Sequence, residues 1–257
     1  MQTAAPTKIN ICGIGFSDLT PPAAASLAAE ILARPEKNAK YVVTPNPEIA
    51  ENAAKNPALR LAIEGAELVL PDGVGIVLAS RVLARRKRVP KALPRCPGID
   101  FCSALLDICA EKGYSVFLFG AKPGVAQSAA ARLAQKHPGL KLAGCRDGYF
   151  RAEESADVLA EINAAAPDFL LICLGSPKQE LWALEHQTAL TGVKLAACLG
   201  GVLDVYSGQV KRAPKWMQKT GLEWLYRLLR EPKRLFRVMK LPLFLVRVLF
   251  GKGEKNK

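Results

Sequence analysis

The sequence has 257 residues, of which 50% are hydrophobic, and a formal net charge of +13 at pH 7. This length suits one well-filled domain with a small appendage, and no apolar run approaches the roughly 18 residues of a membrane-spanning helix. The polar segment 1–8 disfavours a secretory signal peptide. Seven cysteines without a C-x-x-C pair disfavour a zinc site or a disulfide framework and fit reduced thiols in a cytosolic protein.

The positive charge is concentrated at the end of the chain. Residues 211–257 contain 14 Lys and Arg against three acidic residues, whereas the rest of the chain is nearly neutral, with 22 basic and 20 acidic residues. A basic tail favours an anionic partner, which at this level is membrane lipid, nucleic acid or a phosphorylated ligand.

The first predicted strand covers residues 8–15 and ends in the run Gly13-Ile14-Gly15. This run resembles a dinucleotide-binding turn, but Asp18 stands where the third glycine belongs, so a plain strand-to-loop turn is favoured over a NAD-type site. A helix is predicted over residues 23–33, because Thr20-Pro21-Pro22 is a good helix start.

Two short apolar runs, Tyr41–Val43 and Leu68–Leu70, predict buried strands joined by one crossover helix. Each run ends in turn residues, Thr44-Pro45-Asn46-Pro47 after the first and Pro71-Asp72-Gly73 after the second. Parallel strands place both turns at the same sheet edge, where open α/β sheets bind ligands. Asn46 and Asp72 are therefore expected in one cleft. There Asp72 is either a carboxylate free to accept a proton or only the cap of a helix that begins near Gly75.

After the helix predicted over 75–83, a basic loop follows over 85–95, with prolines at 90, 94 and 97. Its arginines are either solvated or available to pair with a diphosphate. Further helices are predicted over 98–112, 125–137 and 153–165, and strands over 115–119, 141–145, 169–174 and 195–199. The loop 120–124 leads into a helix N-terminus and suits an anion or nucleotide, although it is not a Walker A loop. This repeated pattern predicts a doubly wound, mostly parallel sheet.

The last fifty residues show apolar positions at helical spacing with arginines and lysines between them, and Trp216 and Trp224 precede them. Pro232 and Pro242 divide the segment into short helices. A basic amphipathic helix favours binding at a membrane surface, and the alternative is a helix packed on the domain with solvated arginines. The continuous apolar face favours lipid over nucleic acid.

Several catalytic patterns are absent from the sequence: it contains no G-x-S-x-G, no H-E-x-x-H and no D-x-D. A nucleotide-sugar donor leaves as a diphosphate, whose charge is commonly balanced by a metal held by such carboxylates. Without a D-x-D motif, arginines and helix N-termini must balance that charge.

Five strings carry a family resemblance: TPNPE (44–48), PDGVG (71–75), FGAKPG (119–124), GSPKQE (175–180) and the long block over 200–234. In this order they resemble the TagA/WecG/CpsF family of bacterial glycosyltransferases, and the match covers nearly the whole chain. The family transfers a sugar from a UDP donor to an undecaprenyl-diphosphate-linked saccharide. The resemblance implies a Rossmann-like core, here 1–204, and a membrane-binding appendage, here 205–257, that helps to close the active site.

The resemblance also implies inverting transfer without a metal or other cofactor, with Asp72 as general base. Thr44 and Asn46 match residues that position the sugar, and Arg95 matches an arginine that faces the diphosphate. The sequence departs from the family at Cys96-Pro97, where a Val-Thr pair is expected. The loop residues Gly120, Ala121 and Gly124, with Gly175, Gln179 and Glu180, are expected to contact the UDP donor or the acceptor. The arginines expected at the lipid diphosphate or membrane are Arg227, Arg230, Arg234 and Arg237.

The expected partners are thus a UDP-sugar, an undecaprenyl-diphosphate-linked saccharide and the anionic inner face of the cell membrane, with self-association open and no nucleic acid. The donor sugar is left open among N-acetylmannosamine, its uronic acid and glucose. The alternative of another class is a non-catalytic peripheral protein that only binds a nucleotide or polyprenyl diphosphate. A protein that only binds its ligand does not need a carboxylate at position 72, beside Asn46.

Overall fold

The computed structural model describes residues 6–35, 39–232, 235 and 239–250. Its centre is a six-stranded sheet with the order β4-β3-β8-β7-β5-β6, in which every neighbouring pair is parallel. The expected α/β, Rossmann-like sheet is confirmed. The strands are β3 (Lys40–Val43), β4 (Leu68–Val69), β5 (Ser115–Gly120), β6 (Lys141–Arg146), β7 (Phe169–Cys173) and β8 (Leu195–Cys198).

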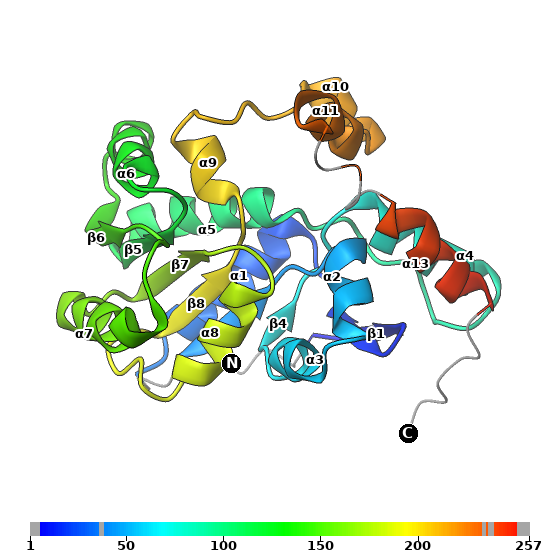
Figure 1. Ribbon diagram of the computed structural model, residues 1–257, viewed down its shortest axis with the longest axis horizontal. Coiled ribbons are helices and arrows are strands. Elements are labelled where there is room, and N and C mark those ends of the chain that lie inside the picture. Colours follow the sequence, from blue (N-terminus) through cyan, green and yellow to red (C-terminus); the bar gives the residue numbers. More distant parts are fainter. Residues whose placement is uncertain (1–5, 36–38, 233–234, 236–238, 251–257) are drawn as a thin grey trace.

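Helices cover both faces of this sheet (Figure 1), so the strands are buried on both sides and read as apolar runs. Along β5, Phe117 and Phe119 enter one core cluster, whereas Val116 and Leu118 enter the other. The second cluster includes α1 (Pro21–Leu32), α5 (Gly98–Lys112), α6 (Val125–Lys136) and α9 (Val202–Tyr206). The first includes α2 (Pro47–Ala53), α3 (Pro57–Glu64), α4 (Val74–Arg85), α7 (Ser155–Ala165), which follows a 3₁₀ turn over Ala152–Glu154, and α8 (Lys178–His186).

The N-terminal segment differs from the prediction of a single strand over 8–15. It forms a separate antiparallel hairpin of β1 (Lys8–Ile11) and β2 (Ile14–Ser17), which places Gly15 inside a strand. Cys12 and Gly13 form the turn with φ values of +52° and +82°, the positive values that tight hairpin turns require. Gly13 and Gly15 therefore belong to a hairpin and not to a dinucleotide-binding loop.

The crossover between β3 and β4 is also more complex than the single helix that was predicted. It contains α2 and α3, and each begins with a proline after an asparagine cap. The side-chain oxygens of Asn46 and Asn56 accept hydrogen bonds from the backbone N–H groups of Ile49 and Leu59, at 3.0 and 3.1 Å. An asparagine followed by a proline is a strong helix start, so each pair begins a helix of its own.

The C-terminal part contains α10 (Lys215–Thr220), α11 (Glu223–Arg230) and α13 (Lys240–Phe250). Figure 1 shows α10 and α11 close together and away from the central sheet, and α13 beside α4. One side of α13 packs on the core through the buried Phe244 and Val248, and Arg247 pairs with Glu51 of α2 at 3.1 Å. The helix is therefore docked on the domain, as the alternative interpretation expected, while its other side remains exposed.

Among the described residues, no helix is both long and apolar enough to cross a bilayer. The exposed side of α13 nevertheless carries Leu243, Val246 and Phe250, with exposed fractions of 52%, 51% and 80%. The division into a core over 1–204 and an appendage over 205–257 stays a prediction.

The junction of β5 and β7 leaves no room for a side chain at Gly120. Its φ is +125°, and a Cβ atom there would lie 2.4 Å from the backbone oxygen of Cys173. Gly120→Ala is therefore expected to lower the free energy of unfolding by about 2 kcal/mol or more, measured by urea denaturation. Gly124→Ala is the matched control, because Gly124 also has a positive φ but nothing within 4 Å. Equal losses in the two variants would contradict the clash at Gly120.

Candidate active site

A pocket of about 220 Å³ opens at the carboxyl ends of β4, β3 and β8. Thr44, Asn46, Asp72 and Arg95, the four predicted catalytic residues, all line it, and so does Arg227 from α11. The strand ends bring the first three together, as expected for an open parallel sheet. Sequence reasoning missed other parts of the wall, namely Gly201, Val205, Glu223, Trp224 and Leu241.

Asp72 lies in the short turn between the end of β4 at Val69 and the start of α4 at Val74. The N-cap of α4 is Gly73, with φ +81° and no side-chain cap hydrogen bond, so the alternative of Asp72 as a helix cap is wrong. Protein atoms surround the carboxylate closely enough that desolvation raises its pKa. The negative charge of Glu223 acts in the same direction, whereas Arg227, Arg95 and a backbone hydrogen bond from Gly98 oppose it. The site thus holds a carboxylate whose proton affinity is higher than usual.

Thr44 and Asn46 flank Asp72 from the end of β3. Asn46 caps α2 with its side-chain oxygen, which leaves the N–H groups of its amide for a ligand. The hydroxyl of Thr44 lies 3.5 Å from the backbone oxygen of Cys198, a long contact, and the side chain is 8% exposed. Both residues therefore retain hydrogen-bonding capacity beside the carboxylate.

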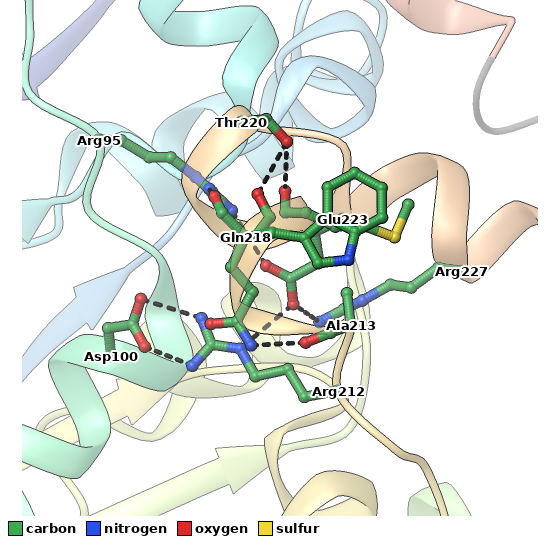
Figure 2. A network of polar contacts seen from close by, with 10 residues as sticks. Arg95, Asp100, Arg212, Ala213, Gln218, Thr220, Glu223 and Arg227 are labelled. Atoms are coloured by element: carbon green, nitrogen blue, oxygen red, sulfur yellow. Dashed lines mark hydrogen bonds and ion pairs between the residues drawn. The ribbon is translucent and has the colours of Figure 1, made fainter.

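A network of ion pairs closes the side of the pocket formed by α11 (Figure 2). Glu223, only 5% exposed, lies 3.0 Å from Arg95, 3.2 Å from Arg227 and 3.3 Å from Arg212. Arg212 also forms a two-pronged ion pair with Asp100 of α5. A second nitrogen of Arg95 donates to the backbone oxygen of Gln218 at 2.6 Å. Arg95 is thus held at both terminal nitrogens by residues more than 120 positions later in the chain.

Comparison with known proteins identifies the family. The model for the glycosyl transferase WecG/TagA/CpsF family matches residues 9–257. The chain belongs to this family. It is 36% identical over 222 residues, 86% of its length, to a Bacillus subtilis protein, of which 83% is covered. It is 32% identical over 250 residues, 97% of its length, to a Staphylococcus aureus protein, of which 95% is covered. Both relatives are named N-acetylglucosaminyldiphosphoundecaprenol N-acetyl-beta-D-mannosaminyltransferase.

This chain of the WecG/TagA/CpsF family is therefore a glycosyltransferase, as the sequence motifs predicted. The residues predicted at the UDP donor lie at the same edge of the sheet but outside the pocket. Gly120 ends β5, Ala121 and Gly124 lie in the loop before α6, and Gly175 follows β7. Because β7 lies next to β8, and β5 lies next to β7, these loops extend the edge beyond the pocket wall.

Gln179 and Glu180 are buried behind that wall, with exposed fractions of 3% and 1%. The amide nitrogen of Gln179 donates to Glu180 at 2.8 Å, and its oxygen accepts from the backbone N–H of Gly175 at 3.2 Å. Burial raises the pKa of Glu180. A Cβ atom on Gly200, which lines the pocket, would lie 3.2 Å from the oxygen of Gln179. Gln179 thus packs against Gly200 of the pocket wall. Its contact with substrate stays a prediction.

The four arginines expected at the lipid diphosphate are in different situations. Arg227 lines the pocket, and Arg230 is exposed, with its guanidinium 5.3 Å from the ring centre of Tyr226. Arg234 and Arg237 lie outside the described residues.

Proposed function

We propose that this glycosyltransferase transfers N-acetylmannosamine from a UDP donor to undecaprenyl-diphosphate-linked N-acetylglucosamine, with Asp72 as general base. The observation that carries the proposal is a carboxylate of raised proton affinity in a pocket that also contains Arg95 and Arg227. The names of the relatives supply the sugar and the acceptor. The uronic acid and glucose are the competing donor sugars.

The proposed chemistry is a single displacement. Asp72 accepts the proton of the acceptor hydroxyl as that oxygen attacks the anomeric carbon, and the bond from this carbon to the diphosphate oxygen of UDP breaks. Attack from the face opposite the leaving group inverts the configuration at the anomeric carbon. A raised pKa suits the role, because proton transfer is most effective when the pKa of the base approaches the working pH.

The leaving UDP carries a negative diphosphate, and this proposal balances its charge with protein groups alone. Arg95 and Arg227 provide two guanidinium groups at the pocket, and guanidinium pairs with phosphate oxygens in a fork. The helices α4 and α5 both begin at the pocket wall, with Val74 and Gly98. Their N-termini add partial positive charge. We therefore propose that transfer needs no metal ion.

The acceptor is carried by a lipid, and α13 suits a position on the membrane surface. Its exposed Leu243, Val246 and Phe250 can enter the interface. Each basic residue near an anionic leaflet adds about 1 kcal/mol. The seven cysteines are all free thiols, which fits a reducing compartment. We propose that the protein lies on the cytoplasmic face of the membrane.

The test is UDP release by the full-length protein from UDP-N-acetylmannosamine, with a short-chain polyprenyl-diphosphate-linked N-acetylglucosamine as acceptor. UDP-N-acetylmannosaminuronic acid and UDP-glucose are tested in parallel, each with and without EDTA. We expect release that requires the acceptor, prefers UDP-N-acetylmannosamine and persists in EDTA. Loss of release in EDTA would overturn metal independence. Donor binding in calorimetry without release from any donor would favour the non-catalytic binder.

A further inference from the structure

Glu223 is the first residue of α11, and its carboxylate lies at the centre of the arginine network (Figure 2). One carboxylate oxygen contacts Arg95 at 3.0 Å, and the other contacts Arg227 at 3.2 Å and Arg212 at 3.3 Å. A buried carboxylate is stable when its charge is paired and hydrogen-bonded. The three arginines pair with this charge. Pairing alone does not explain why two of them, Arg95 and Arg227, also line the pocket.

Arg212 differs from the other two arginines in its second partner. Its terminal nitrogens pair with both carboxylate oxygens of Asp100, so this arginine connects the loop before α10 to α5. In the described part of the chain, neither Arg95 nor Arg227 forms a two-pronged pair of this kind, and both line the pocket. The side chains of Arg95 and Arg227 are 25% and 37% exposed. The Asp100–Arg212 pair thus provides a structural connection, whereas Glu223 contacts the arginines that a ligand can reach.

Arg95 also keeps unused hydrogen-bonding capacity. Its Nε–H is buried and has no hydrogen-bond partner among the residues that the structure describes. An unpaired buried donor is costly to the folded state. The terminal nitrogens are held by Glu223 and Gln218, so the guanidinium group is fixed at the pocket wall.

We propose that Glu223 is a positioning residue of the transfer reaction, whose carboxylate fixes Arg95 and Arg227 at the pocket wall so that both guanidinium groups meet the diphosphate of a substrate. The proposal rests on the proposed function, because it assumes a diphosphate in this pocket. Donors that are already in place stabilise developing charge without reorganising during the reaction. Without Glu223, the two flexible side chains would have to be ordered by the substrate itself.

The test is a double-mutant cycle on kcat/KM for UDP release in the assay described above. Glu223→Gln keeps the size of the side chain and removes its charge, and it is combined with Arg95→Gln and, separately, with Arg227→Gln. We expect Glu223→Gln alone to lower kcat/KM by about 10- to 100-fold. In either arginine variant the same change should cost several-fold less than in the unmodified protein, because one of the two groups on which Glu223 acts is already lost.

The effect of Glu223→Gln on kcat and on KM shows which diphosphate the arginines contact. A lower kcat at unchanged KM places the arginines on the leaving diphosphate of UDP, and a higher KM for the acceptor places them on the lipid diphosphate. Both results support the proposal. Fully additive losses in both cycles would overturn it, because they would show that Glu223 acts independently of the two arginines, as a purely structural residue does.

Two further variants make the outcome unambiguous. Glu64→Gln removes the exposed Arg60–Glu64 ion pair of α3, in which Nε and Oε1 are 2.8 Å apart. Its two residues are four positions apart, as in the Glu223–Arg227 pair. Glu64→Gln should leave kcat/KM unchanged. If Glu223→Gln does not fold, as judged by thermal unfolding, Glu223→Asp takes its place in the cycle, because it keeps the charge but withdraws the carboxylate. Absence of release by the unmodified protein would instead contradict the proposed function.

Discussion

Asp72→Asn is expected to lower kcat for UDP release by about 10²- to 10⁴-fold, the usual contribution of a general base. An amide has no basic oxygen that can accept the hydroxyl proton, whereas its size and hydrogen-bonding geometry are close to those of the carboxylate. The backbone hydrogen bond from Gly98 can therefore persist in the variant. The measurement is acceptor-dependent UDP release at saturating substrate, with Asp157→Asn in the first turn of α7 as the control.

The same substitution should not destabilise the protein. Burial raises the pKa of Asp72, so the folded state binds a proton more tightly than the unfolded state and the charged form opposes folding at neutral pH. A neutral asparagine removes that cost. We expect the Tm of Asp72→Asn to equal or exceed that of the unmodified protein. A large fall in Tm together with lost activity would indicate a structural role, and unchanged kcat would remove Asp72 from the mechanism.

The central sheet could be predicted because its strands are buried on both faces. Runs such as Phe169–Cys173 contain only apolar residues and cysteine, and glycine or proline marks the turns that follow. The limits of α5, Gly98–Lys112, were also predicted. The hairpin at the N-terminus was missed because its turn depends on positive φ at Cys12 and Gly13. A cysteine is an unusual residue at such a position.

The site was predictable where it depends on the sheet and unpredictable where it depends on the C-terminal helices. The rule for parallel strand ends brought Asn46 and Asp72 to one pocket. The same rule placed Gly120 and Gly175 at this edge, but β7 and β5 lie beyond β8 in a strand order that the sequence does not reveal, and neither glycine lines the pocket. Glu223 was missed because its contact with Arg95 spans 128 residues. Its only local signal is the four-residue spacing to Arg227.

Truncation after Gly208 is expected to leave a folded core whose kcat/KM is at least about 100-fold lower. The truncation removes Glu223, Arg227 and Leu241 from the pocket wall, and Arg95 then loses both partners of its terminal nitrogens. The diphosphate then loses the guanidinium of Arg227 and meets an Arg95 that is no longer held in place, and two losses of about tenfold each give a factor of about 100. Far-UV circular dichroism and UDP release are the measurements. A fully active truncation would contradict a role of the C-terminal helices in catalysis.

The truncation also removes the surface that we propose for the membrane, so a full-length control must separate the two effects. Leu243 and Val246 are exposed on α13, whereas Phe244 packs on the core. Replacing Leu243 and Val246 with serine should therefore abolish sedimentation with anionic phospholipid vesicles and preserve UDP release with the short-chain acceptor. Release from a full-length lipid acceptor in vesicles should fall in the serine variant. Equal losses with both acceptors would mean that the exposed side of α13 supports the pocket and not membrane binding, because only the second acceptor requires the enzyme to reach a bilayer.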